Sequence, residues 1–345
     1  MGTKRKNSGA SCTLKDIGLA CNLTISTVSR VLSGTSKKHV YAPQTIELIK
    51  KKAEELGYHP NRLVQGIRNN RTRSIGVFIC LGWYSKVLEG ICAEIDRENH
   101  GCVLELYEYD LETQGEEAMT QRINRLLEHR VDGIILRSIS DDIVDQYFSK
   151  IYQLGMPLVV IDRKLPDVLA DFVGSDDYNG GTKVAEFLIK LGHQNFILQH
   201  GAMSTDRYAR SMGFKDTVLK AGFNISTVRS SDFAELSLII KSVLMRKDRA
   251  TAIFCTNDDN AEIVYKEAKS LGLKIPDDLS VVGYGNSEQS RYFDPPLTTV
   301  DQSAYDIGTL AARQIFKRLD GAETRAQTDV LIPTKLIVRQ SCKML

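Results

Sequence analysis

A run of hydroxyl side chains that ends in an arginine has the clearest chemistry in this chain. Residues 24–30 read Thr-Ile-Ser-Thr-Val-Ser-Arg. On a helix, Val28 turns inward, and the hydroxyls and the Arg30 guanidinium stay outside. Hydroxyls bond phosphates, and a guanidinium can bond guanine O6 and N7 together. We therefore expect this face to read a DNA major groove, with contacts from Thr24, Ile25, Ser26, Thr27, Ser29 and Arg30.

Three helices must position that face. Thr13 and Asp16 have the spacing of a capping box at the start of a first helix, and Thr24 can cap a second that runs to about Leu32. A third is predicted over 43–56, between Pro43 and Gly57. The residues expected to pack inward are Leu14, Ile17, Ala20, Val28, Val31, Leu32, Ile46, Ile49, Ala53 and Leu56.

Residues 26–32, Ser-Thr-Val-Ser-Arg-Val-Leu, resemble the signature of the helix-turn-helix in the lactose/galactose repressor family of bacterial transcriptional regulators. The alternative on this segment alone is a structural helical hairpin, which shares the same periodicity. Lys50, Lys51 and Lys52 surround the outer face of the third helix. Contact with phosphate and a merely solvated helix face are equally compatible with these lysines.

The segment that follows also resembles this family. Leu-Gly-Tyr-His-Pro-Asn at 56–61 precedes a helix of one or two turns that Asn61 caps, and Arg-Thr and Ile-Gly-Val come next. A helix this short is marginal in water. In the family two such hinge helices of a dimer enter the minor groove, and the residue that matches the wedge is Ile67. The alternative is a linker that touches nothing.

The charge is divided unevenly along the 345 residues. Residues 1–73 hold 14 basic and 4 acidic residues, whereas the remainder holds 31 basic and 39 acidic ones. A basic head on an acidic body is typical of a protein that binds nucleic acid. A solvated basic tail would account for Lys4-Arg5-Lys6, but most of the other basic residues lie in patterned helices.

The sequence lacks the features typical of membrane, secreted, disulfide-bonded and metal-binding proteins. No run of about 18 apolar residues predicts a transmembrane helix, and the N-terminus has no apolar core typical of a secretory signal. The seven cysteines are scattered without a C-x-x-C, which favours reduced thiols, and no ligand spacing predicts a metal. We expect a cytoplasmic, nucleoid-associated bacterial protein with no cofactor and no membrane partner.

From Ser74 onward, apolar runs alternate with helical stretches. This alternation predicts parallel sheets with crossover helices, and about ten strands exceed one comfortable sheet. The strands expected are 75–81, 102–107, 133–137, 157–161, 195–199, 251–255, 279–283 and 297–301, with a last one at 335–339. The helices expected include 85–99, 115–129, 178–191, 207–221, 258–271 and 304–319.

The resemblance to the repressor family extends along this part. It rests on Val131-Asp132-Gly133, Ile161-Asp162-Arg163, Leu191-Gly192-His193, Thr256-Asn257-Asp258 and Val282-Gly283-Tyr284, among other motifs. It implies an N-terminal all-α helix-turn-helix domain plus an α/β periplasmic-binding-protein-like core of two doubly wound parallel-sheet subdomains.

The domains expected from this resemblance are a helix-turn-helix domain at 1–58, a hinge helix and linker at 59–73, and an effector-binding and dimerisation core at 74–345. Within the core, subdomain one is expected at about 74–174 and 304–330, and subdomain two at about 176–300 and 332–342. The segments that cross between them should fall near 174–176, 300–303 and 330–333.

The expected effector site lies beyond the carboxyl ends of the strands, where open α/β sheets bind ligands. Polar groups there can bond sugar hydroxyls, and aromatic rings can stack on sugar C–H faces. The candidates are Trp83, Tyr84, Asp162, Arg210, Phe233, Asn257 and Gln302. In the family, Arg210, Asn257 and Gln302 match positions that contact ligand, and Phe233 matches an aromatic platform.

Several of these candidates have a purely structural alternative. Asp162 could cap a helix or pair with Arg163, Asn257 could be a turn residue, and Trp83 could be packing. One position also departs from the family, because Gly285 stands where most sugar-binding members have an aspartate. A phosphorylated sugar, a disaccharide or a sugar acid therefore suits the site better than a free hexose.

The function expected is a sequence-specific DNA-binding transcriptional regulator, most simply a repressor of a carbohydrate-utilisation operon that a small sugar-like effector controls. Because one short helix reads few base pairs, a homodimer on a near-palindromic operator is expected. An enzyme is the second hypothesis, but no Walker loop, G-x-S-x-G or H-E-x-x-H occurs. A ligand carrier is the third, and the basic head argues against it.

Overall fold

The computed structural model describes residues 12–345 with several gaps. The segments outside the description are 1–11, 33–40, 59–70, 80–83, 98–101, 109–110, 138–141, 154, 165–167, 169, 202–204, 231 and 322–326. The chain divides into two compact units, Met1–Thr72 and Arg73–Leu345. Each unit is described by itself below.

The first unit, the head, contains the three predicted helices: α1 (Leu14–Cys21), α2 (Ile25–Leu32) and α3 (Pro43–Glu55). Ile17, Val28 and Ile49, one from each helix, are fully buried and form the centre of a small core. The prediction of burial is wrong for two residues. Ala20 is exposed, because α1 buries Gly18 against the turn, and Leu56 is exposed because α3 ends before it.

Side chains fix the ends of the first two helices as predicted. The Thr13 hydroxyl accepts a hydrogen bond from the Asp16 amide while the Asp16 carboxylate accepts one from the Thr13 amide. Thr24 accepts from the Thr27 amide at 3.2 Å. Between them, Asn22 ends α1 in the left-handed conformation, with φ 53°. These caps set where α2 begins, and so which of its residues face outward.

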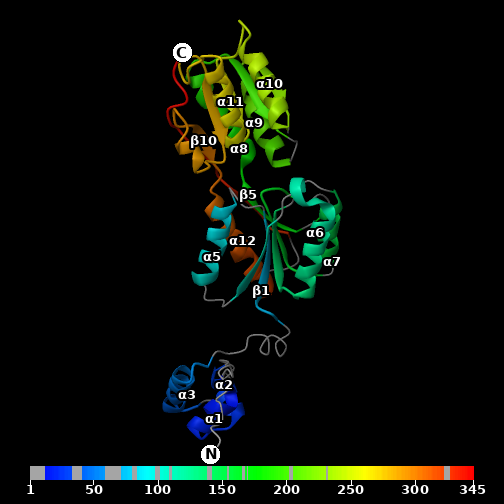
Figure 1. The fold of residues 1–345 in the computed structure, drawn as a ribbon, viewed down its shortest axis with the longest axis vertical. Helices are drawn as coiled ribbons and strands as arrows, with labels where there is room; N and C mark the ends of the chain where they lie inside the picture. The colour runs from blue at the N-terminus through cyan, green and yellow to red at the C-terminus, as the bar shows by residue number, and fades with distance from the viewer. Residues whose placement is uncertain are drawn as a thin grey trace, which may run out of the picture. The chain divides into compact units, whose positions relative to one another are not determined.

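The second unit contains two six-stranded sheets (Figure 1). The sheet that contains the strand starting at Ser74 forms the amino lobe, with all its strands parallel in the order β11-β5-β4-β3-β1-β2. Its strands are β1 (Ser74–Ile79), β2 (Val103–Glu108), β3 (Gly133–Arg137), β4 (Leu158–Ile161), β5 (Asp171–Ser175) and β11 (Asp329–Ile332).

Helices cover both faces of the amino-lobe sheet (Figure 1). One face packs against α5 (Ser85–Arg97) and α12 (Ala304–Leu319). The other packs against α6 (Leu111–Glu128) and α7 (Asp142–Gln153). Residues of β1 alternate between the two cores, with Val77 on the α5 side and Phe78 on the α6 side.

The second sheet forms the carboxy lobe, in the order β12-β10-β9-β8-β6-β7. Its strands are β6 (Asn195–His200), β7 (Asn224–Arg229), β8 (Ala252–Cys255), β9 (Ser280–Tyr284), β10 (Thr298–Asp301) and β12 (Lys335–Ile337). Helices α8 (Asp177–Lys190) and α9 (Thr205–Lys220) cover one face, and α10 (Phe233–Leu244) and α11 (Asp258–Ser270) cover the other. A short 3-10 helix, η2 (Gln289–Arg291), precedes β10.

The fold class is confirmed, with two differences from the sequence prediction. The described residues contain twelve strands and not about ten, because short strands such as β5, β7 and β11 lack a long apolar run. In addition, β12 pairs antiparallel with β10, so the carboxy lobe is not purely parallel. The chain passes between the sheets after Ser175, after Asp301 and after Ile332.

Candidate functional site

The outer face of α2 is the first candidate site. Ile25, Ser26 and Arg30 are exposed, Thr27 and Ser29 are half-buried, and Thr24 is exposed at the cap. The Thr24 hydroxyl lies 2.9 Å from the hydroxyls of both Ser26 and Thr27. Since Val28 and Val31 are buried on the opposite face, the helix presents a largely polar edge that has Ile25 at its start and a guanidinium near its end. Such an edge has the chemistry to contact phosphates and base edges.

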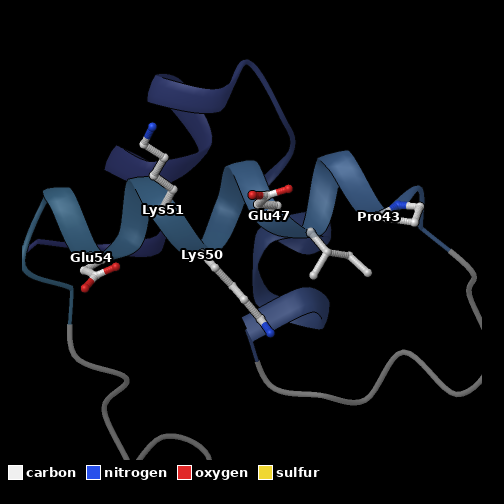
Figure 2. Close-up of a pocket in the computed structure, with 6 residues that line it drawn as sticks. Pro43, Glu47, Lys50, Lys51 and Glu54 are labelled. Atoms are coloured by element: carbon white, nitrogen blue, oxygen red, sulfur yellow. The ribbon is translucent and has the colours of Figure 1, made fainter.

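The outer face of α3 is mixed in charge. A hollow of about 600 Å³ lies against it, lined by Pro43, Ile46, Glu47, Lys50, Lys51 and Glu54. Figure 2 shows Lys50 and Lys51 pointing to opposite sides of the helix. Lys52, the third lysine, pairs with Glu55 at 2.5 Å. This helix therefore has no unbroken basic stripe, and α2 is the better candidate for reading DNA.

A second candidate site centres on Asp177, the first residue of α8. The Ser175 and Tyr284 hydroxyls donate to its Oδ1 at 2.6 and 2.7 Å, and the Arg210 guanidinium binds its Oδ2 at 2.6 Å. The Gln302 amide donates to the Ser175 hydroxyl at 2.9 Å and approaches Asp177 at 3.4 Å. Burial raises the pKa of Asp177, while Arg210 works against that shift.

Arg210 is held on three sides. Besides Asp177, it donates from Nη1 to the Thr256 carbonyl at 2.8 Å, and its guanidinium carbon lies 4.0 Å from the centre of the Tyr284 ring. Burial raises the pKa of Tyr284 well above its ordinary value, so the phenol keeps its proton. The result is a rigid, buried guanidinium at the carboxyl ends of the carboxy-lobe strands.

The amino lobe contributes a smaller group. The Tyr84 hydroxyl donates to Asp162, which follows β4, and Arg137 at the end of β3 approaches the same carboxylate at 3.5 Å. The Arg137 guanidinium also lies over the Tyr84 ring, 5.1 Å from its centre. The charge of Asp162 raises the pKa of both Asp177 and Tyr284. The two groups together are called the strand-end cluster: Tyr84, Arg137, Asp162, Ser175, Asp177, Arg210, Tyr284 and Gln302.

Other predicted site residues lie near strand ends without joining this cluster through a described contact. Asn257 follows β8 and caps α11, accepting from the Asn260 amide at 2.7 Å. Phe233 is the first residue of α10, and its side chain is 61% exposed. Three predicted residues lie outside the described part of the chain: Asn61, Ile67 and Trp83.

Sequence reasoning missed the residues that organise the strand-end cluster. Asp177 had a signal, since the adjacent carboxylates at 176 and 177 follow a strand and precede a helix. Arg137 likewise ends a predicted strand. The role of Tyr284 could not be predicted from the sequence, because a tyrosine within an apolar strand is most simply interpreted as a core residue. For Asp162, the described partners are Tyr84 and Arg137.

Gly285 follows β9 with φ 123°, a conformation that favours glycine. Buried Asp258 holds the loop after β9, because it accepts hydrogen bonds from the Thr299 hydroxyl and the Ser287 amide, both at 2.7 Å. Those bonds engage both carboxylate oxygens of Asp258 in holding the loop. The positive φ at position 285 thus explains why a glycine, and not the aspartate of most sugar-binding members of the family, suits this position.

No helix in the described part of the chain combines the length and the apolar character needed to cross a bilayer. In the same residues, no group of three or more histidine, cysteine, aspartate or glutamate side chains is arranged to hold a metal ion.

Comparison with known proteins identifies the family of two parts of the chain. Residues 13–61 match the family described as bacterial regulatory proteins, lacI family, and residues 185–342 match the periplasmic binding protein-like domain. The chain is 28% identical to the ribose operon repressor of Haemophilus influenzae, over 95% of this chain and 98% of that one. It is also 28% identical to the repressor PurR of Vibrio vulnificus, over 96% and 98%.

Solved structures of regulators also resemble the fold of this chain. The Lac repressor bound to ONPG in the repressed state has a TM-score of 0.78 and 25% identity, over 96% of this chain and all of that one. A LacI family regulator of Enterococcus faecium with bound ribose has a TM-score of 0.67 and 25% identity, over 79% and 99%. The chain accordingly belongs to the lacI family of bacterial regulatory proteins, and it is a DNA-binding transcriptional regulator and not an enzyme.

Proposed function

We propose that this regulator is a repressor that binds a near-palindromic operator as a homodimer and is controlled by a carbohydrate or carbohydrate derivative. The observation that carries the proposal is a polar outer edge on α2 in the same chain as a buried guanidinium at the strand ends. The first suits DNA and the second suits a polar small molecule. Relatives named as the ribose operon repressor and the transcriptional repressor PurR support the repressor assignment, and a related structure with bound ribose supports the carbohydrate assignment.

In this proposal residues 1–58 read the major groove, 59–73 form a hinge helix and linker, and 74–345 bind the effector and dimerise. Base and phosphate contacts come from Thr24, Ile25, Ser26, Thr27, Ser29 and Arg30, and minor-groove contacts from Asn61 and Ile67. The effector is held by Trp83, Tyr84, Asp162, Arg210, Phe233, Asn257 and Gln302. The arrangement of Arg210 and Gln302 around Asp177 supports the assignment of these two residues.

A DNA-binding experiment tests the first half. Gel shifts against genomic fragments should find a site with two related half-sites, at which the protein binds as a dimer. Arg30→Ala should weaken binding to that site by about 1–3 kcal/mol and relax its sequence preference. Lys50→Ala, on the mixed face of α3, is the matched control. If Arg30→Ala weakened specific and random DNA alike, Arg30 would be a phosphate contact and not a base reader.

A ligand-binding experiment tests the second half. Calorimetry with ribose first, then other pentoses, hexoses, disaccharides and sugar phosphates, should identify a sugar that changes operator affinity. Arg210→Ala should abolish that response and leave operator binding intact, since effector control needs unequal affinity for two states of the protein. Unchanged sugar affinity in Arg210→Ala would remove Arg210 from the site, and an operator that no sugar affects would overturn the carbohydrate assignment.

A further inference from the structure

Ser303 has a backbone conformation that its residue type does not favour. It lies between β10 and α12 with φ 56° and ψ 49°, in the left-handed region. Glycine adopts that region freely, and asparagine and aspartate reach it often, but a serine there is strained. The residue stands at the start of α12, yet its side chain makes no capping hydrogen bond. Backbone strain of this kind persists only where surrounding contacts impose it, and it gathers at functional sites and switch regions.

The strained residue lies in one of the three crossings between the lobes. β10 belongs to the carboxy-lobe sheet, whereas α12 packs on the amino-lobe sheet (Figure 1). The other two crossings continue the ends of β5 and β11, which pair in register as Ser175 with Ile332. All residues at 175–177 and 332–335 are described, and none of them has a positive φ. Strain at the crossings is thus confined to Ser303.

A series of side chains from the carboxy lobe holds this conformation. Asp301 Oδ1 accepts a hydrogen bond from the Ser303 amide at 2.8 Å, and Asp301 Oδ2 accepts one from Asn286 Nδ2 at 3.1 Å. Asn286 Oδ1 accepts in turn from Arg339 Nη2 at 2.7 Å. Arg339 also donates to the Leu297 carbonyl at 2.6 Å, so the series ends on the loop before β10. We call Asp301, Asn286 and Arg339 the crossing clamp.

The crossing clamp is linked to the strand-end cluster along the chain. Gln302 lies between Asp301 and Ser303, and its amide donates to the Ser175 hydroxyl of the first crossing at 2.9 Å. A rotation of one lobe against the other must change backbone dihedrals at the crossings, and a few hinge residues absorb such a change. Because the first and third crossings are tied to each other as paired strands, the change falls most easily on Ser303, whose ordinary conformation has the lower energy.

We propose that Ser303 is the residue at which the lobes turn, and that the crossing clamp fixes one of two lobe arrangements by holding Ser303 in its strained conformation. This inference rests on the proposed function, since effector control needs two states that bind the effector unequally. Asp301 and Asn286 are positioning residues, which set the balance between the arrangements. Because the strain opposes the clamp, relief of the strain and loss of the clamp should shift that balance in opposite directions.

The first test removes the strain in the full-length protein. Its readout is the sugar concentration at the midpoint of the change in operator affinity, with ribose as the first probe and the wider sugar panel after it. Ser303→Gly removes the Cβ that makes the left-handed region unfavourable, so it favours the clamped arrangement and should shift the midpoint by about fivefold or more. Ser303→Ala is the matched control and should leave the midpoint unchanged, because it keeps the Cβ and removes a hydroxyl that makes no capping bond.

The second test exchanges two residues of the crossing clamp. Asp301→Asn keeps an oxygen for the Ser303 amide but turns an NH₂ group toward that of Asn286, so the midpoint should move in the direction opposite to that of Ser303→Gly. Adding Asn286→Asp restores a donor opposite an acceptor and leaves an acceptor for Arg339. The double variant should therefore return to the midpoint of the unaltered protein. A change in overall stability alone does not produce this pattern, because the compared states are both folded.

The outcomes separate this inference from the proposed function. Equal midpoints in Ser303→Gly and Ser303→Ala, shifts of the same sign in Ser303→Gly and Asp301→Asn, or a double variant that is not restored would each overturn the inference and leave the proposed function standing. If Asp301→Asn does not fold, the comparison of Ser303→Gly with Ser303→Ala decides by itself. An unaltered protein whose operator affinity no sugar changes would overturn the proposed function and this inference with it.

Discussion

The two lobes have the same strand order but use buried charge differently. In each, a central five-strand order is completed at the edge by a strand from the last part of the chain. The amino lobe buries its carboxylates Glu94 and Asp171 against arginines of its own helices. The carboxy lobe directs Asp177 and Arg210 to its strand ends. One topology thus supports stability away from the carboxyl ends of the strands in the amino lobe, and places a buried ion pair within the strand-end cluster in the carboxy lobe.

The lobes also share a way of packing their long helices. At the α5–α12 crossing, a Cβ on Gly308 would meet the Val87 carbonyl oxygen at 1.9 Å, and at the α8–α9 crossing a Cβ on Gly181 would meet that of Arg210 at 1.9 Å. Glycine lets the backbones touch. In the carboxy lobe, however, the contacted backbone is that of Arg210 itself, so helix packing and the site are coupled there.

The largest expected effects come from removing one buried carboxylate in each lobe. Asp171→Ala and Asp177→Ala should each lower the free energy of unfolding by about 3–5 kcal/mol, because each leaves an arginine buried without its partner. Only Asp177→Ala should also weaken sugar binding, because Arg210 loses its anchor. Chemical denaturation and calorimetry measure the two effects. Equal loss of sugar affinity in both variants would contradict the division between the lobes.

The next-largest losses of stability are expected at the two helix crossings. Gly308→Ala and Gly181→Ala should each lower the free energy of unfolding by about 2–4 kcal/mol, because the helices must separate to admit a methyl group. Gly181→Ala should in addition displace Arg210 and reduce sugar affinity. A normal sugar affinity in Gly181→Ala would show that packing and binding are independent.

A smaller, pH-dependent effect is expected at the α5–α12 crossing. Hydrogen bonds from Arg97 and Arg313 lower the pKa of Glu94 to about 2. Because the folded-state pKa lies below the ordinary value, this carboxylate stabilises the fold above about pH 4.5, and the contribution fades as the pH falls toward 2.

The variant that tests this is Glu94→Gln. At pH 7 it should lose about 1–2 kcal/mol of unfolding free energy, less than the pKa shift alone implies because both arginines are half-exposed. At pH 3 the loss should be smaller. Denaturation curves at the two pH values measure it, and a loss that is constant between them would contradict the ion-pair explanation.

The smallest effect on stability is expected from Asn257→Asp. Aspartate caps a helix as well as asparagine does, so the free energy of unfolding should change by less than about 0.5 kcal/mol. The side chain nevertheless loses its amide donor and gains a charge, so the affinity for ribose or another bound sugar should fall. If calorimetry showed no change, Asn257 would be only the cap that the described structure contains.

Much of the head was predictable because its signals are local. The capping box at Thr13, the Thr24 cap and the burial of Ile17, Val28 and Ile49 follow from spacing within one or two helical turns. Ala20 and Leu56 failed for a related reason. Their burial depends on where a partner segment ends, and periodicity within one helix carries no information on that.

In the core, the order of apolar and polar residues was enough to predict the alternation of strands and helices, and with it two sheets of largely parallel strands. It also placed polar candidates at strand ends, since those positions follow from strand boundaries. Membership of the repressor family followed from the same linear motifs. These conclusions depend only on the pattern of residues within short segments of the sequence.

Which of those polar groups contact one another depends on how the folded elements pack. Asp177, Arg210 and Gln302 are separated by up to 125 residues, and the crossing segments bring them within hydrogen-bond distance. Packing also brings Asp162 against Tyr84 and Arg137, and it makes β12 antiparallel to its neighbour β10. The Gln199 side chain, buried in β6, has no hydrogen-bond partner. Sequence spacing cannot fix such contacts, because the packing of whole elements sets the distances between their side chains.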